Sequence, residues 1–271
     1  MIHAMTMCLV LLAAAPDERV AVPHNPNHGF AIDYDGSFLF AHPGKAEGEV
    51  VLTRFARDGS RLRETFTYPQ KFEGVLELMP TKRGLVIVDY ESGFVGLVDR
   101  RGKIVWETRT RYPNVARLDA EGNPWFFFNS DIVGIKTSDS SEVEPVLEES
   151  GAEIVLFAPA DIAPIGGGKF YLLDQEGGIH LFGTTGKAAL FGEVVGGQRI
   201  LVSKLGGVLV FRSGTLIHVS PSGKKRSIWQ TPSDLPANIR HLSRAPDGRL
   251  VMAGSTREGG IVLIIDPEAG S

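Results

Sequence analysis

Short apolar runs alternate along the chain with polar turns that contain glycine. Each unit begins with an apolar strand, turns at a glycine, and continues into a run of three or four apolar residues. Two further strands follow, separated by polar turns. A four-stranded unit of about 40 to 50 residues is typical of one blade of a β-propeller. The glycines of the first turns are Gly36, Gly84, Gly122, Gly168, Gly207 and Gly248.

The spacing of these glycines supports six copies of the unit. Successive glycines lie 48, 38, 46, 39 and 41 residues apart. Continuous apolar runs after them indicate strands that are buried on both faces, as when sheets stack against one another. We therefore predict an all-β fold, a six-bladed β-propeller, with one domain over residues 16–271. The predicted second strands are 38–40, 85–88, 125–128, 170–173, 208–211 and 250–252.

The two ends of the domain predict how the ring closes. In several units a fourth strand follows the second turn, as at 61–67 and 103–108. The sixth unit reaches its second turn at Asp266 and has no fourth strand, whereas residues 18–22 form a strand without a place in the first unit. We expect 18–22 to pair with 261–266, so that the N-terminal strand completes the last blade and removes an open sheet edge.

Residues 1–15 are apolar and contain no Asp, Glu, Lys or Arg. This stretch, which ends in three alanines, resembles the core of a secretory signal peptide. As a signal peptide it would place the mature protein in the periplasm or outside the cell, and its removal would take away the lone Cys8. The alternative is an ordinary buried strand in a cytoplasmic protein.

Several segments resemble the repeat of NHL-type propellers. They are Ile87–Gly93 and Leu172–Gly178, each of which leads from a second strand into a third, and Asp119–Phe126. The resemblance extends over nearly the whole chain and implies blades rather than a particular activity.

A narrower resemblance is to the gluconolactonase and senescence-marker-protein family. It rests on Glu73-Gly74 and on Asn114, eight residues before Gly122. Members are six-bladed propellers that use a divalent metal, often calcium, so the resemblance implies a calcium-dependent lactonase. The segment Gly122–Phe126 also resembles propeller lyases that inactivate antibiotics.

Geometry predicts a polar ring at one mouth of the central channel. The innermost strands of a propeller begin at the same end, 7 to 11 residues before each turn glycine. Every unit has a polar residue there: Asn27 and His28, Glu73, Asn114, Asp161, Gln198 and Asn238.

Two interpretations of this ring remain open. Glu73, Asn114, Asp161 and Asn238 could supply the oxygen ligands that Ca²⁺ prefers. The metal would then polarise an ester or lactone carbonyl, while Glu73, Asp161 or His28 activates water. The alternative is a hydrated channel whose polar lining only binds water.

Composition excludes some functions. A net charge of −4 and a pI near 6.0 argue against nucleic-acid binding. No apolar run reaches the roughly 20 residues of a membrane-spanning helix. Residues 118–186 contain 12 acidic and 2 basic side chains, which predicts an acidic sector. This sector is either a solvated outer edge or a docking site for a basic partner.

Two functions follow from these patterns. The first is a non-enzymatic, exported propeller that binds a protein or a small ligand, because no complete catalytic motif appears. The second is a metal-dependent lactonase or other hydrolase that acts at the mouth of the channel. In neither case does the sequence name the ligand or the partner.

Overall fold

The protein is described by a computed structural model over residues 18–24, 26–47, 49–68, 76–109, 113–119, 121–128, 131–134, 144–145, 159–183, 188–235 and 238–269. Within these residues the regular secondary structure is β-strand except for a single 3-10 helix, η1, which covers Pro26–His28. No helix among them is long and apolar enough to cross a membrane.

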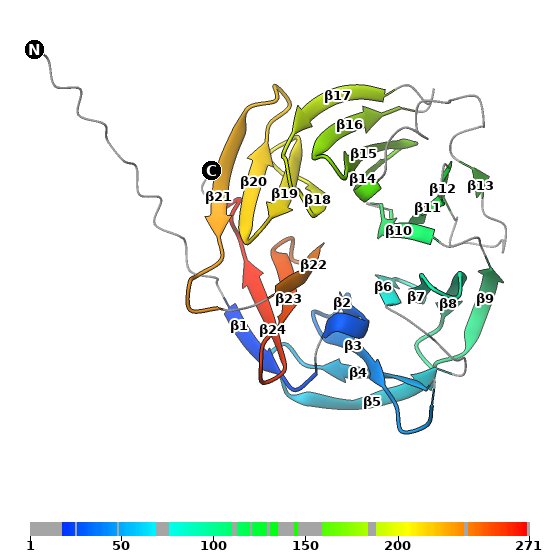
Figure 1. The fold of residues 1–271 in the computed structure, drawn as a ribbon. Helices are drawn as coiled ribbons and strands as arrows, with labels where there is room; N and C mark the ends of the chain where they lie inside the picture. Colours follow the sequence, from blue (N-terminus) through cyan, green and yellow to red (C-terminus); the bar gives the residue numbers. More distant parts are fainter. Residues whose placement is uncertain are drawn as a thin grey trace, which may run out of the picture.

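The described strands form six four-stranded antiparallel sheets, arranged around a common axis (Figure 1). We name each sheet after its innermost strand. The β2 sheet contains β2 (Phe30–Ile32), β3 (Phe38–Pro43), β4 (Val50–Phe55) and β5 (Arg61–Tyr68), and the β6 sheet contains β6 (Leu76–Thr81), β7 (Gly84–Asp89), β8 (Phe94–Val98) and β9 (Ile104–Arg109). The β10 sheet contains β10 (Pro113–Leu118), β11 (Pro124–Phe128), β12 (Asp131–Gly134) and β13 (Glu144–Pro145), and the β14 sheet contains β14 (Pro159–Gly166), β15 (Lys169–Asp174), β16 (Gly178–Phe182) and β17 (Ala188–Glu193). The β18 sheet contains β18 (Arg199–Val202), β19 (Val208–Arg212), β20 (Thr215–Val219) and β21 (Lys225–Gln230), and the β22 sheet contains β22 (Asn238–Arg244), β23 (Leu250–Ser255), β24 (Gly260–Ile265) and β1 (Glu18–Val22).

The predicted second strands are confirmed, and their burial explains their composition. In β7, Leu85 and Ile87 pack toward the β2 sheet, whereas Val86 and Val88 pack toward the β10 sheet. Every pair of neighbouring sheets shares one apolar cluster of this kind, and the clusters follow one another around the ring. A strand between two such clusters has no solvent-facing side, so it contains no alternating polar residues. The all-β propeller fold is therefore confirmed.

The turn glycines are required by the backbone. Gly207 has φ 73°, in the left-handed region that favours glycine, and it lies between β18 and β19. A Cβ at this position would also collide with the carbonyl oxygen of Val219 in β20. The regular spacing of glycine in the sequence therefore reports the regular spacing of tight turns.

The predicted closure of the ring is confirmed. β1 pairs with β24 in antiparallel register, from Glu18 opposite Ile264 to Val22 opposite Gly260. Val20 and Val22 are buried in the cluster between the β22 and β2 sheets. The first described strand thus fills the fourth position of the sheet formed by the last three.

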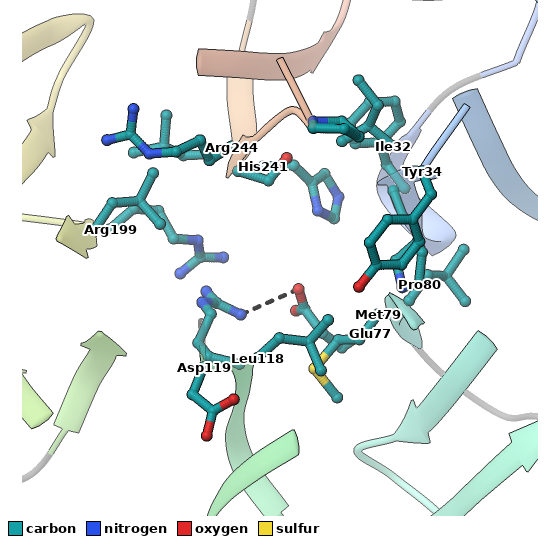
Figure 2. A pocket seen from close by; sticks show the side chains of 18 residues that line it. Ile32, Tyr34, Glu77, Met79, Pro80, Leu118, Asp119, Arg199, His241 and Arg244 are labelled. Carbon is teal, nitrogen blue, oxygen red and sulfur yellow. Dashed lines mark ion pairs between the residues drawn. The ribbon is translucent and has the colours of Figure 1, made fainter. Parts of the chain in front are cut away.

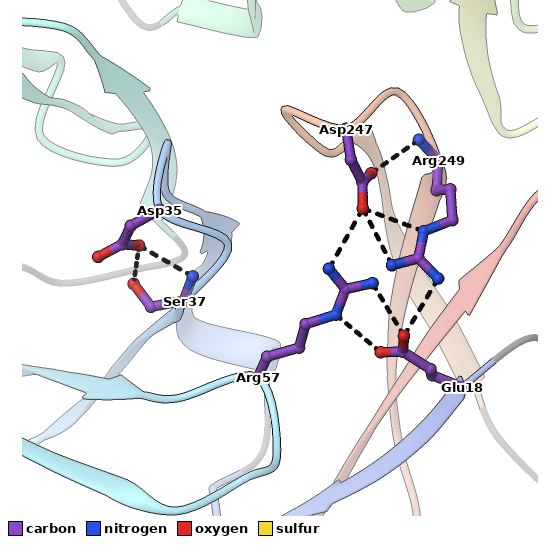
Figure 3. Close-up of polar contacts among 6 residues, drawn as sticks. All are labelled: Glu18, Asp35, Ser37, Arg57, Asp247 and Arg249. Carbon is purple, nitrogen blue, oxygen red and sulfur yellow. Dashed lines mark hydrogen bonds and ion pairs between the residues drawn. The ribbon is translucent and has the colours of Figure 1, made fainter.

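Ion pairs connect the closing strand to two neighbouring turns (Figure 3). Glu18 accepts hydrogen bonds from Nε of Arg57 at 2.8 Å and from Arg249 at 3.1 Å. Both arginines also contact Asp247, at 3.2 Å and 2.9 Å. Arg57 lies in the turn after β4, and Asp247 and Arg249 lie in the turn between β22 and β23. The network therefore joins the β2 and β22 sheets across the point of closure.

Removal of β1 tests the closure. We expect a chain that lacks residues 1–22 to be less stable than one that lacks residues 1–17, because only the shorter chain loses β1. Burial of Val20 and Val22 alone contributes about 3 to 6 kcal/mol, at 1.5 to 3 kcal/mol for each side chain. Urea unfolding of the two truncated proteins measures the difference. Equal unfolding midpoints would contradict the role given to β1.

Candidate functional site: the central channel

The centre of the ring is lined by one polar side chain from each of five inner strands. These residues are Glu77 of β6, Arg117 of β10, Asp161 of β14, Arg199 of β18 and His241 of β22. In the β2 sheet the corresponding place is taken by Phe30, whose ring lies 5.9 Å from that of His241. We call the five polar residues the channel ring.

Arg117 is the hub of the channel ring. One of its terminal nitrogens contacts Oε1 of Glu77 at 3.0 Å, and the other contacts Oδ1 of Asp161 at 2.7 Å. Its Nε is buried and has no partner among the described residues. Burial would lower the pKa of the Arg117 guanidinium, but Asp161 and Glu77 raise it well above its ordinary value. Arg117 therefore stays charged and links three neighbouring sheets.

Asp161 is fixed on every side. Its side chain is 1% exposed, and its Oδ2 accepts a hydrogen bond from the backbone N–H of Ile200 at 2.9 Å. Its Oδ1 accepts from its neighbour Ile162 N–H at 3.0 Å as well as from Arg117. Both carboxylate oxygens of Asp161 are thus engaged by donors, which fixes the side chain between three neighbouring strands.

Glu77 is ionised but is less enclosed. The Tyr90 hydroxyl donates to its Oε2 at 3.2 Å. Burial would raise the pKa of Glu77, but the positive charge of Arg117, with His241 and Arg199 nearby, holds it below its ordinary value. Burial and the adjacent Glu77 charge raise the pKa of Tyr90, so the phenol stays protonated and remains a donor.

His241 is neutral and has a defined tautomer. Its Nε2 lies 2.9 Å from the carbonyl oxygen of Pro26, which can only accept, so Nε2 carries the proton. Nδ1 is then left with a lone pair. Burial lowers the pKa of His241, although the charge of Glu77 and the bond to Pro26 oppose the shift.

The two remaining arginines of the channel differ in their partners. Arg199 donates from Nε to the carbonyl of Arg240 and from one terminal nitrogen to that of Gln198, both at 3.1 Å. It makes no ion pair with any described residue. Arg244, in contrast, contacts the buried carboxylate of Glu268 at 2.7 Å and the carbonyl of Val202 at 3.0 Å.

A cavity of about 300 Å³ extends from the channel ring to the turns that follow the inner strands. Figure 2 shows Arg199, His241 and Glu77 directed toward the same space, while Arg244 points away from it. Apolar side chains cover the walls, and the exposed Tyr34 and Pro246 mark the end near the solvent. The cavity thus has a charged floor and apolar walls.

The sequence placed the polar ring at the opposite mouth, and the structure distributes those residues differently. Asp161 lies in the channel ring. His28 is exposed in η1, and Gln198 is exposed with its side-chain oxygen accepting from the N–H of Ser213 at 3.2 Å. Neither lines the cavity.

The other predicted ligands are untested by the described residues. Glu73 lies outside them. Asn27 of η1, Asn114 of β10 and Asn238 of β22 lie within described elements, but their side chains are not described. Their convergence at one mouth therefore stays a prediction.

Calcium does not fit the carboxylates of the channel ring. A guanidinium already contacts both Glu77 and Asp161, and it would repel a cation placed on the same oxygens. Among the described residues, no group of three or more His, Cys, Asp or Glu side chains is placed to hold a metal ion. A calcium site would depend on Glu73, Asn114 and Asn238.

Sequence reasoning missed Glu77, Arg117, Arg199 and His241. All four lie five to eight residues before their turn glycine, as Asp161 does. Glu77, Arg199 and His241 fall within the window of 7 to 11 residues, and Arg117 falls just short of it, but in each unit a polar residue earlier in the sequence was selected instead. The metal hypothesis also favoured oxygen ligands, so two arginines and a histidine at equivalent positions were passed over.

Three acidic residues of the sector 118–186 are used within the sheets. Asp119 accepts from the indole N–H of Trp125 at 3.0 Å and caps the turn after β10. Asp174 contacts Nε2 of His180 at 2.8 Å, and Asp161 belongs to the channel ring. These three side chains are engaged within the protein, and docking of a basic partner on the rest of the sector stays a prediction.

Comparison with known proteins identifies the fold alone. No protein-family model matches the sequence, and no curated protein matches it. Among solved structures, virginiamycin B lyase from Staphylococcus aureus is 14% identical, with a TM-score of 0.57 over 90% of this chain and 86% of that one. A gluconolactonase from Xanthomonas campestris is 12% identical, with a TM-score of 0.56 over 94% and 97%. BamB from Moraxella catarrhalis is 13% identical, with a TM-score of 0.50 over 88% and 83%.

Arg117→Met tests the hub. We expect it to destabilise the protein by about 3 to 5 kcal/mol, because it leaves two buried carboxylates without their counter-ion. Adding Glu77→Gln and Asp161→Asn to this variant should restore part of the loss by removing both charges. Urea unfolding measures the effect, with Arg212→Met on the exposed end of β19 as the control. A loss similar to that of the control would show that Arg117 does not hold the channel together.

His241→Gln tests the neutral histidine. The pKa of His241 in the folded protein lies below its ordinary value of 6.5, so the unfolded chain takes up this proton first as the pH falls. Its contribution is fully present above the unfolded pKa and is lost as the pH falls from there through the folded pKa. Between about pH 7.5 and about pH 5.5, the wild type should therefore lose more stability than the variant. Unfolding midpoints that fall equally in both proteins would contradict this assignment.

Proposed function

We propose that this chain is a six-bladed β-propeller that binds a small organic molecule in its central cavity, as an exported binding protein without catalytic activity. The cavity carries the proposal. Its volume of about 300 Å³ is at the lower end of the range for small-molecule sites. The six sheets and their six shared clusters support the blade count. Export rests on residues 1–15 and their resemblance to a signal peptide.

The polar groups of the channel ring favour binding over a purely structural role. Glu77 and Asp161 both contact Arg117, so each carboxylate has a positively charged partner without a ligand. Arg199 and the Nδ1 of His241 nevertheless face the cavity with unused hydrogen-bonding capacity. If these side chains only filled the centre of the propeller, we would expect them to be apolar, or polar with every group hydrogen-bonded.

A hydrolase or lyase is the second candidate. It is favoured by the lone pair on His241 Nδ1, which could accept a proton from a substrate or from water. Propellers with similar folds include a gluconolactonase and virginiamycin B lyase. Its calcium-dependent form would require Glu73, Asn114 and Asn238 to bind the metal.

Blocking the cavity tests the binding function. A panel of amino acids, carboxylates, amines and sugar lactones is screened for compounds that raise the thermal unfolding temperature. We expect at least one compound to do so in the wild type and to lose its effect in Leu201→Trp, which fills the cavity. The matched control, Leu190→Trp, changes a side chain of β17 that is 72% exposed and should leave binding intact. No stabilising compound, or one that Leu201→Trp does not affect, would refute binding in the cavity.

Turnover distinguishes the second candidate. Esters and lactones are incubated with the wild type and with His241→Gln, with and without added Ca²⁺. Turnover that the variant abolishes would replace the binding function by the enzymatic one. Dependence of that turnover on Ca²⁺ and on Glu73 would support the metal-dependent form.

A further inference from the structure

The walls of the cavity indicate an amphiphilic ligand rather than a sugar. Above the floor the cavity is lined by Ile32, Met79, Leu118, Leu201 and Leu242. Of the polar side chains near this level, Asp119 is engaged with Trp125 and Arg244 with Glu268, which leaves the buried hydroxyl of Ser243 without a partner among the described residues. A polyhydroxylated ligand would lose its hydrogen bonds to water along these walls without replacing them. A ligand with an apolar body and a polar head at the floor would bury its apolar surface instead.

Arg199 selects a carboxylate in the head of that ligand. Its hydrogen bonds to described residues go to two backbone carbonyls, so its positive charge is not neutralised by any described carboxylate in contact with it. Arg117 differs, since two carboxylates contact it directly. A carboxylate of the ligand would neutralise the charge of the Arg199 guanidinium and accept a charge-assisted hydrogen bond from it.

The opposite side of the floor selects a donor with positive charge. Nδ1 of His241 presents a lone pair because Nε2 donates to Pro26. Glu77 shares its counter-ion Arg117 with Asp161, so the two carboxylates together exceed the charge of the guanidinium that contacts them. An ammonium group could donate to His241 and Glu77 at the same time.

The charges of the channel ring sum to zero. Glu77 and Asp161 contribute two negative charges, Arg117 and Arg199 contribute two positive charges, and His241 is neutral. A ligand with a net charge would leave an uncompensated charge in a buried site. A ligand with separated charges of both signs would not.

We infer that the cavity binds an α-amino acid with an apolar side chain, its carboxylate on Arg199, its ammonium group between Glu77 and His241, and its side chain along the apolar walls. This inference rests on the proposed binding function and names its ligand class. The mouth marked by Tyr34 lies at the end where the side chain would point.

Calorimetry with leucine and its two truncated analogues tests the inference. Isoamylamine lacks the carboxylate, and isocaproate lacks the ammonium group. We expect leucine to bind and each analogue to bind at least about tenfold more weakly, since each loses one charge-assisted hydrogen bond. Arg199→Gln should weaken leucine binding but leave isoamylamine unchanged. Glu77→Gln should weaken both leucine and isoamylamine, and the control Arg212→Gln neither.

Each contrary result has a distinct meaning. Isocaproate or isoamylamine binding as tightly as leucine would overturn recognition of both charges. If leucine fails to bind while another compound binds and is lost in Leu201→Trp, the ligand class is wrong and the binding function stands. If no compound binds in the cavity, both fail.

Discussion

The architecture depends on strands that have no face for water. Val86 and Val88 of β7 point to one neighbouring sheet, and Leu85 and Ile87 point to the other. A sheet made of such strands is stable only between two others, and each of those has the same requirement. In a closed ring every sheet has a neighbour on each face, and the six apolar clusters are the contacts between neighbouring sheets. Closure by β1 follows from the same requirement.

Polar chemistry is confined to the axis because the apolar core lies between the sheets. An inner strand can therefore exchange one side chain that faces the axis without disturbing either cluster beside it. Five inner strands place a polar side chain at the axis in this way. Arg117, which contacts two carboxylates, shows that charged side chains there need partners of opposite charge. Charges that gather at the axis must neutralise one another, since backbone and side chains exclude most of the water there.

The order and closure of the sheets could be predicted from the sequence, whereas the site could not. Burial on both faces leaves a continuous apolar run, and a tight turn such as that at Gly207 leaves a glycine, so both are visible without coordinates. The side chain that faces the axis leaves a single polar residue whose position depends on strand register. The predicted ring contained Glu73 instead of Glu77, and this difference of a few residues placed the ring at one mouth of the channel rather than in its middle. The pairing of Arg117 with two carboxylates from neighbouring sheets has no local signature at all.

The shared sheet of β1 and β24 sets the order in which the molecule can be completed. Residues 18–22 find their partner only after residues 260–264 have left the ribosome, nearly the full length of the chain later. Until then β1 has no strand to pair with, and the face of the β2 sheet that carries Phe30 and Phe38 lacks its apolar partners from the β22 sheet. Native structure at this joint is therefore a late, long-range event, and synthesis that stops short of the last strand leaves an open arc with two unpaired apolar ends.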